Sequence, residues 1–322
     1  MEKKKGFTLV ELLVVIAIIA LLMGILMPAL ARVRQLAYRM VSGTNQAGIG
    51  KAMVIYANDN DADYPVAGSR RPIYAQAGQI TSWYAATRLL AYGYTLQNIS
   101  TVNTNITIGS CFYLLIKYAD VAPKQFVNKS DVGCKEFRLS DYTNGSALED
   151  ITDAWDFGET SQGGPATHVS YSYHAPFVYG QFTYPITQQS NPSAPVVADR
   201  NPYLDTNATT YLNISTIPPA LPSWSTTPAR CTDTDGKMNA ACHQLDGQNV
   251  LFNDIHVKFE KMSNCGINND NIYTSWLAAA PTAQVKQMGT WPGSVPTYTN
   301  LATGAARPWS VDDAFLLSDR TN

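Results

Sequence analysis

The first 57 residues carry two successive patterns of apolar and polar positions. A basic leader, residues 1–6 (MEKKKG), precedes a run that is uncharged and mostly apolar from Phe7 onward, apart from Glu11. From Leu12 to Ala31, 20 consecutive residues carry no charge. A helix that rises ~1.5 Å per residue needs about this length to cross a ~30 Å hydrocarbon core. The pattern predicts a transmembrane helix over residues 7–31, and the leader lysines predict a cytoplasmic N-terminus with the rest of the chain exported.

From residue 32 the sequence becomes amphipathic, with arginines alternating against apolar residues at helical spacing. We therefore expect the helix to continue over residues 32–57. Gly43, Gly48 and Gly50 lower its intrinsic stability, so this half must pack on the rest of the protein. A cluster of Asn and Asp followed by Pro65 predicts the end of the helix, because these residues favour turns.

Two features interrupt the apolar run. Glu11 places a carboxylate near its beginning, which costs several kcal/mol unless the side chain reaches an interface or finds a partner. Gly24 and Pro28 predict a kink in the helix, because proline removes a backbone hydrogen bond.

The residues around Glu11 also resemble a known signature. Gly6-Phe7-Thr8-Leu9-Val10-Glu11 is similar to the cleavage motif of prepilins, the precursors of type IV pilins and type II secretion pseudopilins. The resemblance implies that a prepilin peptidase cuts after Gly6 and methylates the new N-terminus at Phe7. It further implies that the Phe7 amine pairs with Glu11 of a neighbouring subunit in a filament. A plain signal anchor is the alternative, whereas an ordinary signal peptide has a shorter apolar core.

The same resemblance implies the partners and the location of the protein. The expected partners are prepilin peptidase, other pilin or pseudopilin subunits, an inner-membrane assembly platform and the lipid bilayer. The protein would be a single-pass component of the bacterial inner membrane, with its head in the periplasm and its filament in the periplasm or at the cell surface.

Residues 58–322 form the expected exported head. Thr, Asn, Ser, Tyr, Gly and Pro are abundant and only 15% of the whole chain is charged, a composition typical of strands and long loops. We predict an α+β fold in which the long N-terminal helix packs on an antiparallel sheet, as the pilin resemblance implies. The net charge of −2 indicates no general attraction to nucleic acid.

Residues 248–260 (QNVLFNDIHVKFE) give the clearest strand signal of the head. Their alternation predicts a hairpin with a tight turn at Asn253-Asp254. The pattern places two apolar pairs on one side of this hairpin, namely Val250 with Phe252 and Val257 with Phe259.

The same region resembles a C-terminal signature of large prepilin-type proteins that are abundant in planctomycetes. In that signature a histidine precedes an Asp-Gly pair by about ten residues, and His-Val follows. Here His243 precedes Asp254 with one additional residue of spacing, and Ile255 replaces the glycine.

Five cysteines follow the predicted anchor, so all would be exported and able to form disulfides. The preferred pairs are Cys111 with Cys134 and Cys231 with Cys242, because each closes a short loop. Cys242 with Cys265 is an open alternative.

Several acidic residues could bind a cation. Asp233 and Asp235 lie in a short Asp-Thr-Asp-Gly loop, and Asp246 and Asp254 lie near two histidines. Calcium is the ion that the pseudopilin resemblance implies for C-terminal loops. The alternative is that these aspartates only form turns.

The chain has no G-x-S-x-G, H-E-x-x-H or Walker motif. We therefore expect a non-enzymatic structural subunit of a type II secretion pseudopilus or of a type IV pilus-like filament. Two alternatives stay open, a membrane-anchored ligand- or glycan-binding protein and an anchored hydrolase.

Overall fold

The fold is that of a computed structural model, and it is described over eleven stretches of the chain. These are residues 9–68, 72–74, 80, 82–92, 104–145, 148–159, 163–176, 178–179, 182–202, 239–276 and 308–319.

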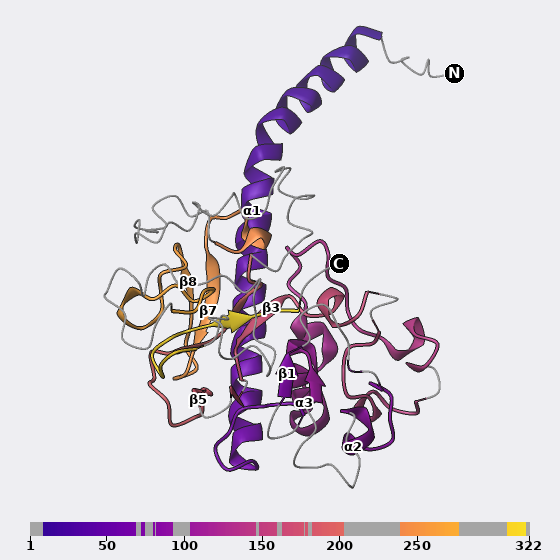
Figure 1. The fold of residues 1–322 in the computed structure, drawn as a ribbon. Helices are drawn as coiled ribbons and strands as arrows, with labels where there is room; N and C mark the ends of the chain where they lie inside the picture. The colour runs from indigo at the N-terminus through magenta and orange to yellow at the C-terminus, as the bar shows by residue number, and fades with distance from the viewer. Residues whose placement is uncertain are drawn as a thin grey trace, which may run out of the picture.

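Helix α1 runs without interruption from Leu9 to Asn58 and is 50 residues long. In Figure 1 it extends through the head and projects far beyond it at the N-terminal end. It ends where the sequence predicts, at the Asn/Asp cluster. The chain reverses there through Asp61 and Ala62, whose φ angles are +53° and +67°.

The two halves of α1 have different surroundings. The apolar window of the helix is not buried at all by the head. Ser42, Gln46, Ile49 and Met53, at helical spacing in the second half, are buried. The amphipathic half therefore packs on the head, as predicted, and the apolar half stands clear of it.

The helix continues through Gly24 and Pro28 without a break in its assignment. Figure 1 shows the projecting part of α1 leaning away from the axis of the part that lies on the head. A bend located at Gly24 to Pro28 stays a prediction.

The head is built around a five-stranded sheet with the order β8-β7-β6-β3-β9. All four neighbouring pairs are antiparallel. The strands are β3 (Tyr171–His174), β6 (Pro195–Asp199), β7 (Gln248–Phe252), β8 (Val257–Glu260) and β9 (Leu316–Leu317).

Smaller elements surround this sheet. Within the described residues, two further helices are α2 (Arg88–Ala91) and α3 (Ile108–Ala119). A parallel pair joins β1 (Pro72–Tyr74) to β2 (Thr104–Ile106), and an antiparallel pair joins β4 (Val178–Tyr179) to β5 (Phe182–Thr183). The 3-10 helices are η1 (Pro123–Phe126), η2 (Leu139–Asp141), η4 (Ile151–Asp153), η6 (Pro165–Thr167), η7 (Ala241–His243) and η8 (Ile267–Asn269).

Apolar side chains cover both faces of the sheet. The larger core joins α1 and α3 to β3, β6 and β7, and it includes Met53, Phe112, Val197 and Leu251. A smaller core contains seven buried residues, which are Ala198, Val250, Phe252, Ile272, Tyr273, Ala314 and Leu316. The long helix packed on an antiparallel sheet confirms the predicted α+β class and gives a pilin-like architecture.

The β7–β8 hairpin is present, but the predicted side-chain faces are wrong. Val257 pairs with Leu251, and Val250 pairs with Lys258. A two-residue turn at Asn253-Asp254 would instead place Val250 opposite Val257. Since a shift of one residue moves every side chain to the other face, Val257 lies on the face of Leu251 toward the larger core.

The shift has its origin in Ile255. The loop includes this residue as well as Asn253 and Asp254, and the Phe252 N–H donates to the His256 carbonyl at 3.0 Å across it. Ile255 has a φ angle of +70°, the left-handed conformation that commonly ends a three-residue hairpin loop. Glycine adopts this conformation without strain, whereas an isoleucine at this position adopts it at a cost in backbone energy.

Candidate functional site

The first candidate site is the apolar surface of α1 before the head. Every described residue from Leu9 to Ala31 is exposed, and Glu11 is the acidic residue of the first turn. Gly6 and Phe7 lie outside the described residues. Cleavage after Gly6, methylation of Phe7 and pairing of Phe7 with Glu11 therefore stay predictions.

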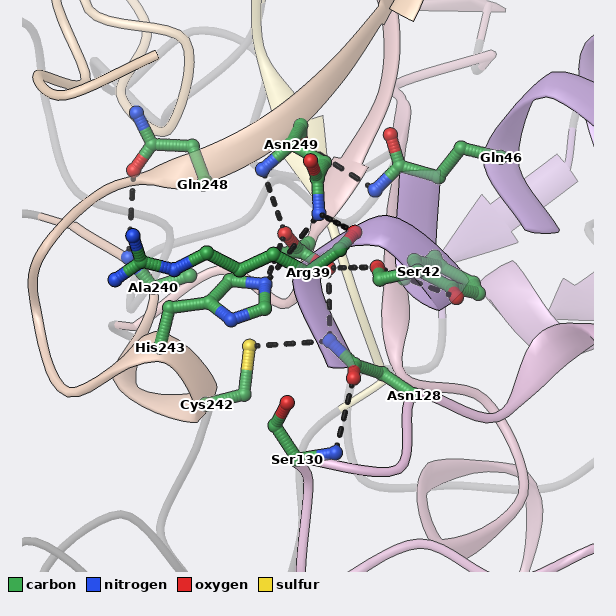
Figure 2. A network of polar contacts seen from close by, with 12 residues as sticks. Arg39, Ser42, Gln46, Asn128, Ser130, Ala240, Cys242, His243, Gln248 and Asn249 are labelled. Carbon is green, nitrogen blue, oxygen red and sulfur yellow. Dashed lines mark hydrogen bonds and ion pairs between the residues drawn. The ribbon is translucent and has the colours of Figure 1, made fainter. Parts of the chain in front are cut away.

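The second candidate site is the place where α1 joins the head. The buried carboxylate of Asp199, at the end of β6, accepts four hydrogen bonds there. Figure 2 labels the four residues that donate them. Its Oδ1 accepts from Ser42 Oγ at 2.8 Å and from Asn128 Nδ2 at 3.1 Å. Its Oδ2 accepts from His243 Nε2 at 2.9 Å and from the Asn249 backbone N–H at 2.7 Å. We call these five residues the Asp199 joint.

Other hydrogen bonds extend the joint along α1. Gln46 Nε2 donates to the Asn249 carbonyl at 3.3 Å, and Asn249 Nδ2 donates to the Arg39 carbonyl at 3.2 Å. Asn45 Nδ2 donates to the Val127 carbonyl at 3.2 Å. Burial alone would raise the pKa of Asp199, but the charge of His243 and the hydrogen bonds to the carboxylate outweigh it, so the pKa is lowered. Asp199 is therefore ionised at neutral pH.

The joint contains a group that could in principle hold a metal. Within the described part of the chain, one set of three potential metal ligands has its ligand atoms within 4.8 Å of one another. This set is Asp199, Cys242 and His243. Both oxygens of Asp199 are already hydrogen-bonded, two donors to each. The geometry is thus complete as a structural connection, and a metal would have to displace these donors.

The predicted calcium residues do not belong to this group. Asp246 pairs with Arg39 at 2.6 Å, and Asp254 pairs with His256 within the hairpin loop. Asp246 and Asp254 thus have separate basic partners, and the structure does not assemble them into a metal site. Asp233 and Asp235 lie outside the described residues, so calcium binding by their loop stays a prediction.

The predicted disulfide between Cys111 and Cys134 is wrong, because both are free thiols. Cys111 lies in α3, buried in the larger core, where its sulfur accepts from the Ala67 N–H. The Cys134 sulfur instead accepts from the guanidinium of Arg200 at 2.6 Å. Burial raises the pKa of Cys111 to about 12, which makes its thiol unreactive.

The other two bridges considered both involve Cys242, and they have different outcomes. Cys265 is a free thiol, so the alternative bridge from Cys242 to Cys265 is not formed. Cys231 lies outside the described residues, and its bridge to Cys242 stays a prediction.

Sequence reasoning missed Asp199 and most of the joint. One signal could have revealed it, because Ser42 and Gln46 precede Ile49 and Met53 at helical spacing on the face of α1 that had to pack. Polar side chains on a buried face need buried partners. Nothing in the sequence identifies Asp199 as the partner, since it is separated from Ser42 by 157 residues.

The comparisons with known proteins identify the N-terminal part of the chain. Residues 1–27 match the family described as the prokaryotic N-terminal methylation motif. No curated protein and no solved structure matches the chain significantly. The matched residues cover the basic residues 1–6, the predicted cleavage position and most of the apolar run. The chain therefore carries a prepilin-type N-terminal methylation motif, followed by a long apolar helix and an α+β head of pilin-like architecture.

Proposed function

We propose that this chain is a structural subunit of a prepilin-type filament, either a type II secretion pseudopilus or a type IV pilus-like filament. Prepilin peptidase removes residues 1–6, and Phe7 becomes the N-methylated first residue. One observation carries the proposal: the methylation motif extends into a helix whose apolar window is not buried by the described part of the head.

The exposed apolar half of α1 supports two successive roles. As a monomer, the protein would keep this surface in the hydrocarbon core of the inner membrane, with the head in the periplasm. On assembly, the same surface would pack against the helices of neighbouring subunits. Helices in lipid associate through close van der Waals contact. Contacts between subunits could therefore begin to form while their helices are still in the bilayer.

Glu11 would set the register of this packing. An ionised carboxylate in apolar surroundings is tolerated when a cation pairs with it and is strongly disfavoured when it is alone. The free amine created at Phe7 supplies such a cation in a neighbouring subunit. Misaligned subunits would leave both charges unpaired.

The head has a mechanical role in this proposal and no catalytic one. The Asp199 joint fixes it to α1, so that the head moves with the helix as subunits are added. The partners would be prepilin peptidase, other pilin or pseudopilin subunits and an inner-membrane assembly platform.

The experiment compares Glu11→Ala with Glu149→Ala in cells that contain the assembly machinery. Glu149 is an exposed carboxylate of the head and controls for loss of one negative charge. We expect Glu11→Ala to be inserted in the membrane but to lose nearly all cross-linked multimers, and Glu149→Ala to form them normally. Undiminished multimers of Glu11→Ala, or none of the native chain, would contradict the proposal and favour an anchored binding protein.

A further inference from the structure

A basic pocket lies where α1 emerges from its predicted membrane span. The cavity has a volume of about 310 Å³. Helix α1 contributes Arg34 and Arg39 to its lining, and the head contributes Lys129, Ser130 and Val132. We call these five residues the basic pocket.

Positive charge dominates this part of the surface. Neither Arg34 nor Lys129 forms an ion pair within the described residues. Arg39 is paired with Asp246 at 2.6 Å. An adjoining cavity of about 410 Å³ adds Arg32 beside that pair. Two buried carboxylates beside lining residues are already engaged, Asp199 by its four donors and Asp131, between Ser130 and Val132, by Arg200 at 3.2 Å. An anion entering the pocket therefore meets a net positive surface.

Two residues that line the pocket also carry polar atoms that lack partners. The hydroxyl of Ser130 and the Nε of Arg39 are buried and have no hydrogen-bond partner among the described residues. Buried polar groups are normally satisfied. A phosphate oxygen can accept from a hydroxyl and from guanidinium N–H groups together, and bonds of the second kind are among the stronger hydrogen bonds in proteins.

The position of the pocket identifies the source of such a phosphate. Arg34 follows Ala31, the last residue of the uncharged run, by three positions. At ~1.5 Å per residue this places it ~5 Å beyond the hydrocarbon core, within the ~5–8 Å headgroup layer on each side of a bilayer. Val132 lines the cavity and is 77% exposed. An apolar group beside clustered cations suits a phospholipid better than a free phosphate ion.

We propose that the basic pocket binds the phosphate headgroup of an anionic phospholipid in the membrane that holds α1. Arg34 and Lys129 supply the charge from the helix and from the head, and Ser130 donates a hydrogen bond. The bound lipid would hold the membrane-facing end of the head against the bilayer. This inference rests on the membrane insertion included in the proposed function.

Native mass spectrometry of the full chain in detergent tests this inference. Phosphatidylglycerol and phosphatidylcholine with identical acyl chains are the probes. The variant Arg34→Gln/Lys129→Gln removes two pocket cations, and Lys51→Gln/Lys124→Gln removes two exposed cations that do not line it. We expect the pocket variant to lose phosphatidylglycerol binding about tenfold or more, and the control variant to bind as the native chain does. Phosphatidylcholine should bind weakly to all three proteins.

Three results would overturn the proposal. They are equal losses in both double variants, unchanged binding in the pocket variant, and displacement of phosphatidylglycerol by millimolar inorganic phosphate. Arg34→Lys keeps the charge and should retain most of the binding, which separates lost charge from lost folding. Cleavage after Gly6 is measured in the same spectra, so a failure of lipid binding in correctly processed protein contradicts only the pocket.

Discussion

His243 donates a 2.9 Å hydrogen bond to Asp199 across 44 positions of the sequence, and this contact lies at the point where α1 meets the head. Ser42 donates to the same carboxylate from α1, and Asn128 donates from the segment after η1. The helix that carries the proposed assembly surface is thus attached to the head by a buried polar joint as well as by apolar packing.

Asp199→Ala should destabilise the protein strongly. The substitution leaves the buried donors of Ser42, Asn128, His243 and Asn249 without their acceptor. Removing one partner from a buried hydrogen-bonded group that holds a charge costs about 3–5 kcal/mol, and we expect a loss of this size in the free energy of unfolding. Denaturant titration of the full chain in detergent, followed by tryptophan fluorescence, measures it.

Asp246→Ala is the matched control for that experiment. Asp246 also pairs with a basic residue, Arg39, but its side chain is 61% exposed. Exposed ion pairs contribute about 0–1 kcal/mol, so this variant should remain close to the native chain. Equal stabilities of the two alanine variants would show that the Asp199 joint does not hold the helix.

Gly50→Ala should destabilise the contact between α1 and β7. A Cβ atom at this position would lie 2.9 Å from both methyl groups of Leu251. Overpacking of this kind costs about 1–3 kcal/mol, which exceeds the gain of ~1 kcal/mol from replacing glycine by alanine in a helix. The midpoint of thermal unfolding should therefore fall.

Gly43→Ala on the same helix should have the opposite effect. The nearest atoms to its new Cβ would be 3.6 Å away, on Asn249 and Val257, an ordinary contact distance. The helix propensity gain then remains, and the midpoint should rise slightly. A lower midpoint for Gly43→Ala than for Gly50→Ala would contradict the described packing of α1.

At position 255 a glycine variant should be more stable than an alanine variant, which is the reverse of the usual order. Ile255→Ala removes side-chain packing but keeps a residue with a Cβ at a φ angle of +70°. Left-handed backbone costs such residues ~1–2 kcal/mol. Ile255→Gly loses the same packing but relieves this cost, so it should be more stable than Ile255→Ala by about 1 kcal/mol. Paired denaturant titrations check the order, and a more stable alanine variant would contradict the loop geometry.

Asp313 should make stability depend on pH. It is buried beside Asp270, whose own pKa is raised by burial and then by the charge of Asp313. Burial raises the pKa of Asp313 from 3.8 to about 8. The folded protein therefore keeps a proton that the unfolded chain releases, and this contribution to stability is lost as pH rises from about 4 to about 8.

Asp313→Asn cannot ionise, so its unfolding midpoint should change less over the same pH range. Thermal unfolding of both proteins between pH 4 and pH 9 tests this expectation. Parallel pH profiles of the native chain and the variant would contradict a protonated Asp313.

The helix could be predicted from sequence because its signals are local. An uncharged apolar run, an amphipathic continuation and a terminal Asn/Asp cluster each act within a few residues, and α1 ends at Asn58, one residue beyond the predicted Ala57. The hairpin was predicted with the wrong faces because one residue decided its register. Isoleucine rarely adopts a left-handed conformation. The residue type at position 255 therefore gave no reason to predict a longer loop.

The Asp199 joint was beyond sequence reasoning for a different reason. Its members come from α1, η7, β6, β7 and the segment after η1. Only tertiary folding brings them together. The predicted Cys111–Cys134 bridge failed for a similar reason, because loop length says nothing about the direction of each thiol, and Cys111 faces the core.

The most direct test of the proposed function is the intact mass and N-terminal sequence of the protein purified from its own membranes. We predict a chain that begins at N-methylated Phe7 and lacks residues 1–6. A chain that still carries the leader, or one cut beyond Ala31, would contradict processing by prepilin peptidase and with it the assignment as a filament subunit.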